Sequence, residues 1–156
     1  MRSDPSDRAK VIALPPLILA ATLALGVGLH LIWPVRLLSG VFALPLGLAL
    51  ISGAIALAAF AVREMHRANT AIDIRKPTTA IVTSGVFKLS RNPIYLGMVL
   101  LCVGIAFAVN SAWILASAAP LALILQKGVI EREEAYLAQK FGAAYLQYKG
   151  SVRRWI

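Results

Sequence analysis

Four stretches of the chain are long and uniformly apolar, and polar segments separate them. The runs cover residues 11–33, 40–62, 93–109 and 111–126, and none contains Asp, Glu, Lys or Arg. The first two hold 23 residues each, about 34 Å of helix, which is enough to cross a hydrocarbon core of about 30 Å. The last two are shorter and meet at Asn110, so they predict a helical hairpin. We therefore predict an all-α integral membrane protein with about four transmembrane helices in a single membrane domain.

The first two spans are predicted to form a tight hairpin of their own, because Arg36 is the only charged residue between them. Small residues recur in both spans at four-residue spacing, a pattern that lets helix backbones approach closely in lipid. They are Ala20, Ala24 and Gly28 in the first span and Ala49 and Gly53 in the second. The last two spans are too short to cross a full bilayer, so we expect the polar segments at the open end of their hairpin to lie partly within the membrane.

Composition and charge agree with a membrane protein. Hydrophobic residues make up 59% of the chain and charged residues only 15%, which lies outside the range of ordinary soluble domains. Nearly all sixteen Lys and Arg residues fall in the N-terminus, the loop 63–92 and the tail 127–156. The positive-inside rule puts these three segments, and hence both termini, in the cytoplasm. We expect a multi-pass protein of the bacterial inner membrane whose net charge of +9 attracts anionic lipids, and we expect no nucleic-acid binding.

The octapeptide SRNPIYLG marks the start of the third span. Asn92 as N-cap and Pro93 at the first helical position form a strong helix start. The backbone N–H groups at this helix end, together with the nearby Lys88 and Arg91, form a favourable binding site for a carboxylate or a phosphate. A snorkelling Arg91 and an interfacial Tyr95 without any ligand explain the same residues.

The tail predicts an amphipathic C-terminal helix on the cytoplasmic side. Its apolar positions fall on one helical stripe, which holds Ile130, Leu137, Phe141, Tyr145 and Tyr148. Glu133 and Glu134 lie on either side of the centre of that stripe. Carboxylates on an apolar face need partners, and these are either basic residues such as Arg91 and Lys88 or the hydroxyl and amine groups of a ligand. A purely structural ion-pair cluster therefore stays open.

Two separated motifs, R-[HN]-P-x-Y-x-G and E-E-x-x-L-x-x-x-F-G-x-x-Y-x-x-Y, occur in this order in the chain. With them, residues 75–155 resemble the isoprenylcysteine carboxyl methyltransferase and phospholipid methyltransferase superfamily. The resemblance implies methyl transfer from S-adenosylmethionine by an integral membrane enzyme, with the cofactor in a cytoplasmic pocket. The cofactor-binding residues that it implies are Lys88, Arg91, Asn92, Pro93, Tyr95, Glu133, Glu134, Tyr145 and Tyr148.

The resemblance assigns no general base, because Asn92 stands where many relatives have histidine and Phe87 where many have tyrosine. S-adenosylmethionine offers a carboxylate to Arg91, and an ammonium and ribose hydroxyls to the two glutamates of the second motif. Arg91 is equally a candidate partner for a carboxylate of the substrate. The methyl acceptor, a lipophilic or small carboxylate, thiol or amine, stays open, and so does the oligomeric state.

The competing class is a non-enzymatic membrane protein, either a small transporter or a helper that binds lipid or a partner. The apolar stretches lack acidic residues, which disfavours a cation transporter, and the facing glutamates disfavour a passive scaffold. The single Cys102 and the separated His30 and His66 give no metal-ligand spacing, so we expect no metal. Further candidates for shaping the pocket are His66, Asn69, Thr70, Arg75 and Thr79.

Overall fold

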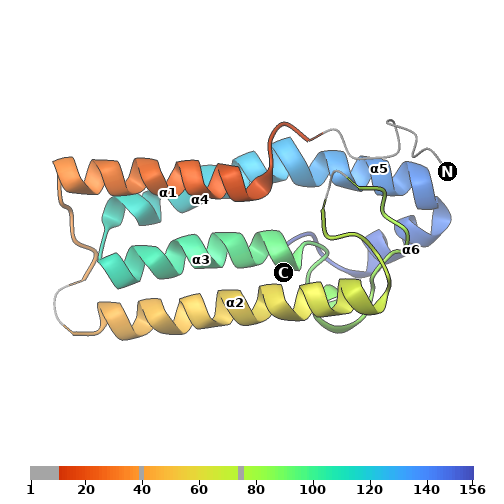
Figure 1. Cartoon of the computed structure of the whole chain (residues 1–156), viewed down its shortest axis with the longest axis horizontal. Helices are drawn as coiled ribbons and strands as arrows, with labels where there is room; N and C mark the ends of the chain where they lie inside the picture. Colours follow the sequence, from red (N-terminus) through yellow and green to blue (C-terminus); the bar gives the residue numbers. More distant parts are fainter. Residues whose placement is uncertain (1–10, 39–40, 74–75) are drawn as a thin grey trace.

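The computed structural model describes residues 11–38, 41–73 and 76–156, and this part of the chain is helical without any strand (Figure 1). The elements follow in the order α1 (Pro15–Ile32), α2 (Ala43–Arg67), η1 (Gly85–Lys88), α3 (Pro93–Val109), α4 (Ala112–Leu125), η2 (Gln126–Ile130), α5 (Glu131–Phe141) and α6 (Ala143–Ser151). The predicted all-α fold is confirmed, and α3 begins at Pro93 as the sequence indicates.

The four apolar helices lie side by side along the long axis of the molecule (Figure 1). Helix α2 packs mainly on α3, α1 packs mainly on α4, and α3 and α4 join the two pairs. Helices α1 and α2 therefore lie at opposite edges of the bundle, and the predicted hairpin of the first two spans is wrong.

The side chain of Asn110 explains why α1 and α2 separate. Asn110 ends α3 in the left-handed conformation at φ 56°, which asparagine tolerates better than most residues. Its Oδ1 accepts hydrogen bonds from the backbone N–H groups of Leu37 (2.9 Å) and Leu38 (3.0 Å), and its Nδ2 donates to the Leu38 carbonyl. Trp113 Nε1 donates to the Trp33 carbonyl at 2.7 Å. These bonds hold the loop after α1 against the α3–α4 turn, so that α2 begins on the far side of α3.

Helices α2 and α3 meet at small residues. Gly47, Ala54 and Ala61 are buried on α2 at seven-residue spacing, and Gly97 and Gly104 are buried on α3. A Cβ atom on Gly47 would lie 2.3 Å from the backbone nitrogen of Ala108. The two backbones are therefore in direct contact, as small residues allow in membrane proteins.

The small residues that the four-residue spacing singled out do not make this contact. Ala20, Ala24, Ala49 and Gly53 are exposed, and a Cβ on Gly28 would meet nothing within 4 Å. These positions therefore lie outside the helix contacts within the chain. A helix in lipid places small residues on its outer surface as readily as on its packed one, and spacing alone does not distinguish the two.

The chain continues as one helix through α4, the π-helical segment η2 and α5, from Ala112 to Phe141. The predicted span 111–126 is thus the first part of a 30-residue helix. The predicted amphipathic C-terminal helix is present as α5, but it continues α4 without a break and does not begin separately at residue 127. The break comes instead at Gly142, whose φ of 53° suits glycine because it has no Cβ. Tyr145 and Tyr148 therefore lie on a second helix, α6, and do not continue the apolar face of α5.

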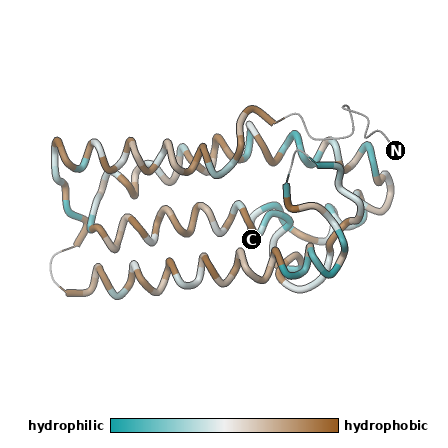
Figure 2. Tube along the Cα trace, in the orientation of Figure 1, coloured by the Kyte–Doolittle hydropathy of each residue, from teal (hydrophilic) through white to brown (hydrophobic). Residues whose placement is uncertain are grey.

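Within the described residues, three helices are long and apolar enough to cross a membrane: Pro15–Ile32, Ala43–Arg67 and Ala112–Phe141. Helix α3, with 17 residues, is a shorter apolar helix alongside them. Figure 2 shows apolar residues along the whole bundle and most polar residues at the end that holds α5 and α6. Large apolar side chains such as Leu25, Ile55 and Phe60 are exposed, as lipid contact requires. This is a membrane protein.

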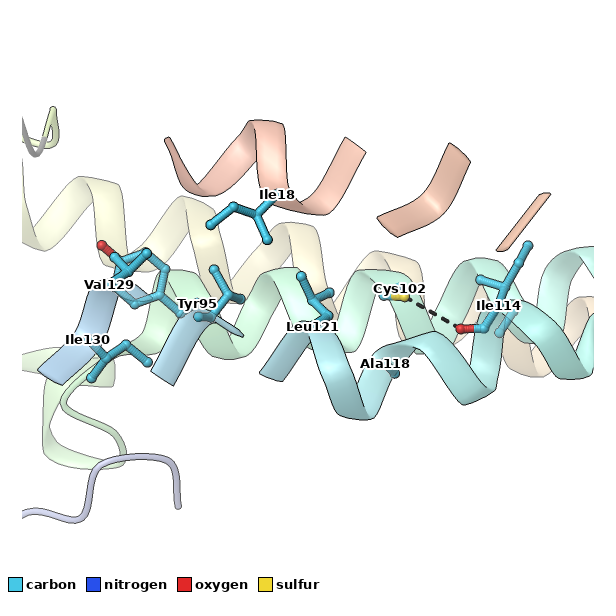
Figure 3. Close-up of a cluster of buried hydrophobic side chains, with 10 residues drawn as sticks. Ile18, Tyr95, Cys102, Ile114, Ala118, Leu121, Val129 and Ile130 are labelled. Atoms are coloured by element: carbon cyan, nitrogen blue, oxygen red, sulfur yellow. Dashed lines mark hydrogen bonds between the residues drawn. The ribbon is translucent and has the colours of Figure 1, made fainter. Parts of the chain in front are cut away.

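A dry core joins α1, α3 and α4 (Figure 3). Ile18, Cys102, Ile114 and Leu121 point into this cluster, and Tyr95 closes it at the polar end of the bundle. The predictions on the basic N-terminus before residue 11, on residue 40 and on Arg75 lie outside the described residues. The orientation of the protein in the membrane therefore stays a prediction.

We expect Gly47→Ala to destabilise the bundle by about 1–3 kcal/mol, the usual cost of overpacking a tight interface. Gly53→Ala is the matched control on the same helix, because its Cβ would lie 3.8 Å from the nearest atom, a Leu100 methyl. Denaturant titration in detergent micelles, followed by far-UV circular dichroism, measures both. Equal stability of the two variants would contradict the packing described here.

Candidate functional site

Two adjoining cavities lie at the polar end of the bundle. The larger, of about 440 Å³, is mostly apolar and is lined by Leu14, Pro15, Pro16, Met65, Ile72, Asp73, Phe87, Arg91, Asn92, Pro93, Ile94, Tyr95, Met98 and Glu133. The smaller, of about 80 Å³, adds residues of α5 and α6, among them Glu134, Leu137, Tyr145 and Tyr148. Arg91, Asn92 and Glu133 line both cavities, so the two motifs meet where the cavities join.

The loop between α2 and α3 forms one wall of the smaller cavity. Thr70 Oγ1 accepts from the Thr79 backbone N–H at 3.2 Å, and Thr79 Oγ1 donates to the Asn69 carbonyl at 2.7 Å. The predicted loop residues Asn69, Thr70 and Thr79 therefore bind one another, and Thr70 lines the cavity. His66 is exposed and lines neither cavity.

The turn before α3 is held against α2 by Glu64. This carboxylate accepts from Ser84 Oγ and from Arg67 Nη1. Gly85 packs directly on the glutamate with φ of 57°, and a Cβ there would lie 2.8 Å from Glu64 Cγ. Phe87, which follows in η1, is thereby placed in the wall of both cavities.

Glu134 of α5 is the centre of an ion-pair cluster. Its side chain is only 5% exposed, and Arg154 binds both of its oxygens, through Nε at 3.0 Å and Nη2 at 2.9 Å. Arg91 Nη1 lies 3.2 Å from Oε1, and Lys149 Nζ lies 3.6 Å from Oε2. Of the two basic partners that the sequence offered for the glutamates, Arg91 lies against Glu134 and Lys88 does not. The negative charge of a buried carboxylate is thus balanced by cations from three segments.

Arg91 keeps unused hydrogen-bond donors. Its side chain is 9% exposed, and its Nε and Nη1 atoms are buried without an acceptor among the described residues. The Nη1 atom is close to Glu134 but does not direct an N–H group at the carboxylate, so this contact is electrostatic and is not a hydrogen bond. Buried donors without acceptors are rare, and these two belong to a residue that lines both cavities.

Glu133 points to a different neighbour from Glu134. Its Oε2 accepts a hydrogen bond of 2.8 Å from the Tyr95 hydroxyl of α3. This bond connects the first motif to the second directly. Because Glu133 lines both cavities while Glu134 is enclosed by cations, Glu133 is the more accessible carboxylate for a ligand.

The side chain of Asn92 does not cap α3. Although Asn92 stands at the N-cap position, it makes no capping bond, and its Nδ2 donates instead to the Arg154 carbonyl at 3.0 Å. Ser90 Oγ donates to the same carbonyl at 3.2 Å. The predicted helix start is correct, but the side chain that was expected to cap it ties the entrance of α3 to the end of the described chain.

Tyr145 and Tyr148 of α6 cover the smaller cavity. Their rings meet edge to face with centroids 6.3 Å apart, and the Tyr148 hydroxyl donates to the Phe87 carbonyl at 2.7 Å. Burial raises the pKa of Tyr145 to about 12, and the negative charge of Glu134 adds to this effect. The positive charge of Arg91 acts in the opposite direction. Both phenols are therefore neutral at physiological pH and serve as packing and hydrogen-bonding groups.

Eight of the nine residues that the resemblance implies line one or both cavities, and Lys88 does not. Lys88 is exposed and makes no ion pair among the described residues. Sequence reasoning missed Met65, which lines both cavities from α2, and Arg154. The only signal for Arg154 was its basic charge in a tail that carries several such residues.

A model of the phospholipid methyltransferase family matches residues 42–144, from the start of α2 into α6, and the chain belongs to this family. Members of this family are membrane methyltransferases, and such enzymes generally use S-adenosylmethionine. Tyr145, Tyr148 and Arg154 lie beyond the matched residues.

A shorter match relates the chain to a bacterial protein. Over 34 residues it is 50% identical to an uncharacterized protein of Haemophilus influenzae, which covers 22% of this chain and 54% of that protein. The chain thus spans about half the length of this relative.

We expect Glu134→Ala to lower the free energy of unfolding by about 3 kcal/mol or more, because it leaves the Arg91 and Arg154 charges without their partner. Glu131→Ala is the control on the same helix. Its carboxylate is 34% exposed and pairs with the exposed Lys127 and, at 3.4 Å, with Arg154, so its loss should lower the free energy of unfolding much less than the loss of Glu134 does. Denaturant titration of both variants in micelles measures the difference, and equal losses would argue against Glu134 as the centre of the cluster.

Proposed function

We propose that the protein transfers a methyl group from S-adenosylmethionine to a lipophilic or small acceptor at the cytoplasmic face of the membrane. One observation carries the proposal: Arg91 lies where the two cavities join, and its Nε and Nη1 atoms are buried without an acceptor in the part of the chain that the structure describes. A methyl donor with a terminal carboxylate supplies the acceptor atoms that this guanidinium lacks.

The residues present fit the cofactor. Arg91 would hold the carboxylate of the cofactor. Glu133 would bind its ammonium or a ribose hydroxyl through one oxygen, while the Tyr95 hydroxyl holds the Oε2 atom of Glu133. Phe87, Leu137 and Tyr148 supply apolar and aromatic surface for an adenine ring. When bound, S-adenosylmethionine supplies an electrophilic methyl group on a sulfonium sulfur.

The larger cavity suits the acceptor. Leu14 and Pro15 of the α1 entrance and Ile94 and Met98 of α3 give it an apolar lining that continues toward the membrane-spanning part of the bundle. These residues would orient a lipophilic molecule and keep water away from its nucleophilic atom, which is the main requirement of an in-line displacement. Amine, thiol and carboxylate acceptors all satisfy this arrangement.

The cytoplasmic location rests on charge. The end of the bundle that holds both cavities also carries Arg63, Arg67, Lys76, Lys88, Lys140, Lys149 and Arg153, and basic residues favour the cytoplasmic side of a bacterial inner membrane. Anionic lipids of that leaflet would then surround the site.

We expect the purified protein in detergent to bind both S-adenosylmethionine and S-adenosylhomocysteine in a saturable manner, and not ATP, in calorimetric titrations. Arg91→Ala should weaken binding about tenfold or more, the cost of losing hydrogen bonds to a charged group. Lys88→Ala removes a nearby exposed charge outside both cavities and should change affinity little. Absence of saturable binding in detergent and in nanodiscs would contradict the proposal and leave a non-enzymatic membrane protein.

We expect Met98→Trp to fill part of the larger cavity and to exclude a lipophilic acceptor while sparing the methyl donor. Transfer of a radiolabelled methyl group into an organic extract of bacterial membranes should fall, while the dissociation constant for S-adenosylhomocysteine stays within about twofold of wild type. If donor affinity falls as far as transfer does, the two cavities do not have separate roles.

A further inference from the structure

The last described residues, 152–156, run back from α6 across the site, and we refer to them as the C-terminal strap. Figure 1 shows the C-terminus beside the start of α3. The Arg153 carbonyl accepts from the Arg91 backbone N–H at 3.0 Å, and Trp155 Nε1 donates to Gln126 Oε1 of η2 at 2.9 Å. With the two bonds to the Arg154 carbonyl from Ser90 and Asn92, the strap joins the first motif to the helix that carries the second.

The side chain of Arg154 makes the closest hydrogen bonds to Glu134. Its planar guanidinium occupies both carboxylate oxygens with hydrogen bonds of 3.0 and 2.9 Å, the fork-like pairing that arginine makes with carboxylates. Arg91 is 3.2 Å from the same carboxylate yet makes no hydrogen bond to it. Both arginines thus contact Glu134, and of the two only Arg154 makes hydrogen bonds to it in this structure.

We infer that Arg154 is a positioning residue that keeps the Arg91 guanidinium available for the anionic group of the ligand. Without Arg154, the buried Glu134 carboxylate needs another donor, and Arg91 is the nearest guanidinium. Arg91 would then turn its free N–H groups onto Glu134 and lose them for the ligand. Lys149 is a poor substitute, because it is 42% exposed and 3.6 Å away. The inference rests on the proposed donor site.

The test compares Arg154→Ala, Arg154→Lys and Arg153→Ala in detergent micelles. Arg153→Ala is the matched control, since it removes the same charge from the neighbouring exposed side chain and keeps the backbone carbonyl. Two quantities are measured: the dissociation constant for S-adenosylhomocysteine, and the ¹⁵N–¹H resonance of the Arg91 Nε group, assigned by its loss in Arg91→Lys.

Arg154→Ala should weaken binding about tenfold and shift the Arg91 Nε resonance in the absence of ligand, as a new hydrogen bond to Glu134 requires. Arg154→Lys keeps the positive charge but not the two-pronged geometry of the guanidinium, so its affinity and its Arg91 Nε shift should lie between those of Arg154→Ala and wild type. Arg153→Ala should match wild type in both measurements. Wild-type affinity in Arg154→Ala would overturn the inference and leave the donor site intact. If the wild-type protein binds no ligand, the proposed function fails, and the Arg91 resonance alone decides: a shift supports the positioning role and an unchanged resonance overturns it.

Discussion

The polar end of this molecule is organised around one buried carboxylate. Glu134 is 4% exposed, and a charge so placed is stable only if cations surround it. Those cations come from the loop before α3, from α6 and from the C-terminal strap, which are far apart in sequence. Balancing this single charge therefore brings both motifs and the end of the described chain to one place, and the cavities lie beside that place.

The helices bring the glutamate there. Because the chain continues without a break from α4 into α5, Glu133 and Glu134 are held on a rigid extension of a membrane-spanning helix. The break at Gly142 then lets α6 fold back over them. Nearer the site α2 packs closely on α3 at Gly97, where a Cβ would lie 3.2 Å from the Ala54 carbonyl oxygen, and the Tyr95–Glu133 hydrogen bond joins α3 to α5. A site built in this way combines an apolar cavity with a charged one, which suits the proposed transfer from a polar methyl donor to a lipophilic acceptor.

The sequence predicted those features that depend on local pattern. Uniform apolar runs predicted the helices, Pro93 predicted the start of α3, and the charge of Arg91 made it one of the candidate partners for the two glutamates. It did not predict which helices are neighbours, because that depends on Asn110 binding a loop more than seventy residues earlier in the chain. It also missed Arg154, since the bend at Gly142 changes the direction of the chain between Glu134 and its partner. Periodicity on a single helix carries no information about either event.

A crystal structure of the protein with S-adenosylhomocysteine, grown in a lipidic mesophase, would test the central claim most directly. The account predicts that the carboxylate of this product lies against Nε and Nη1 of Arg91 while Arg154 keeps both oxygens of Glu134. Product bound away from Arg91, or an Arg91 hydrogen-bonded to Glu134 in the complex, would contradict it.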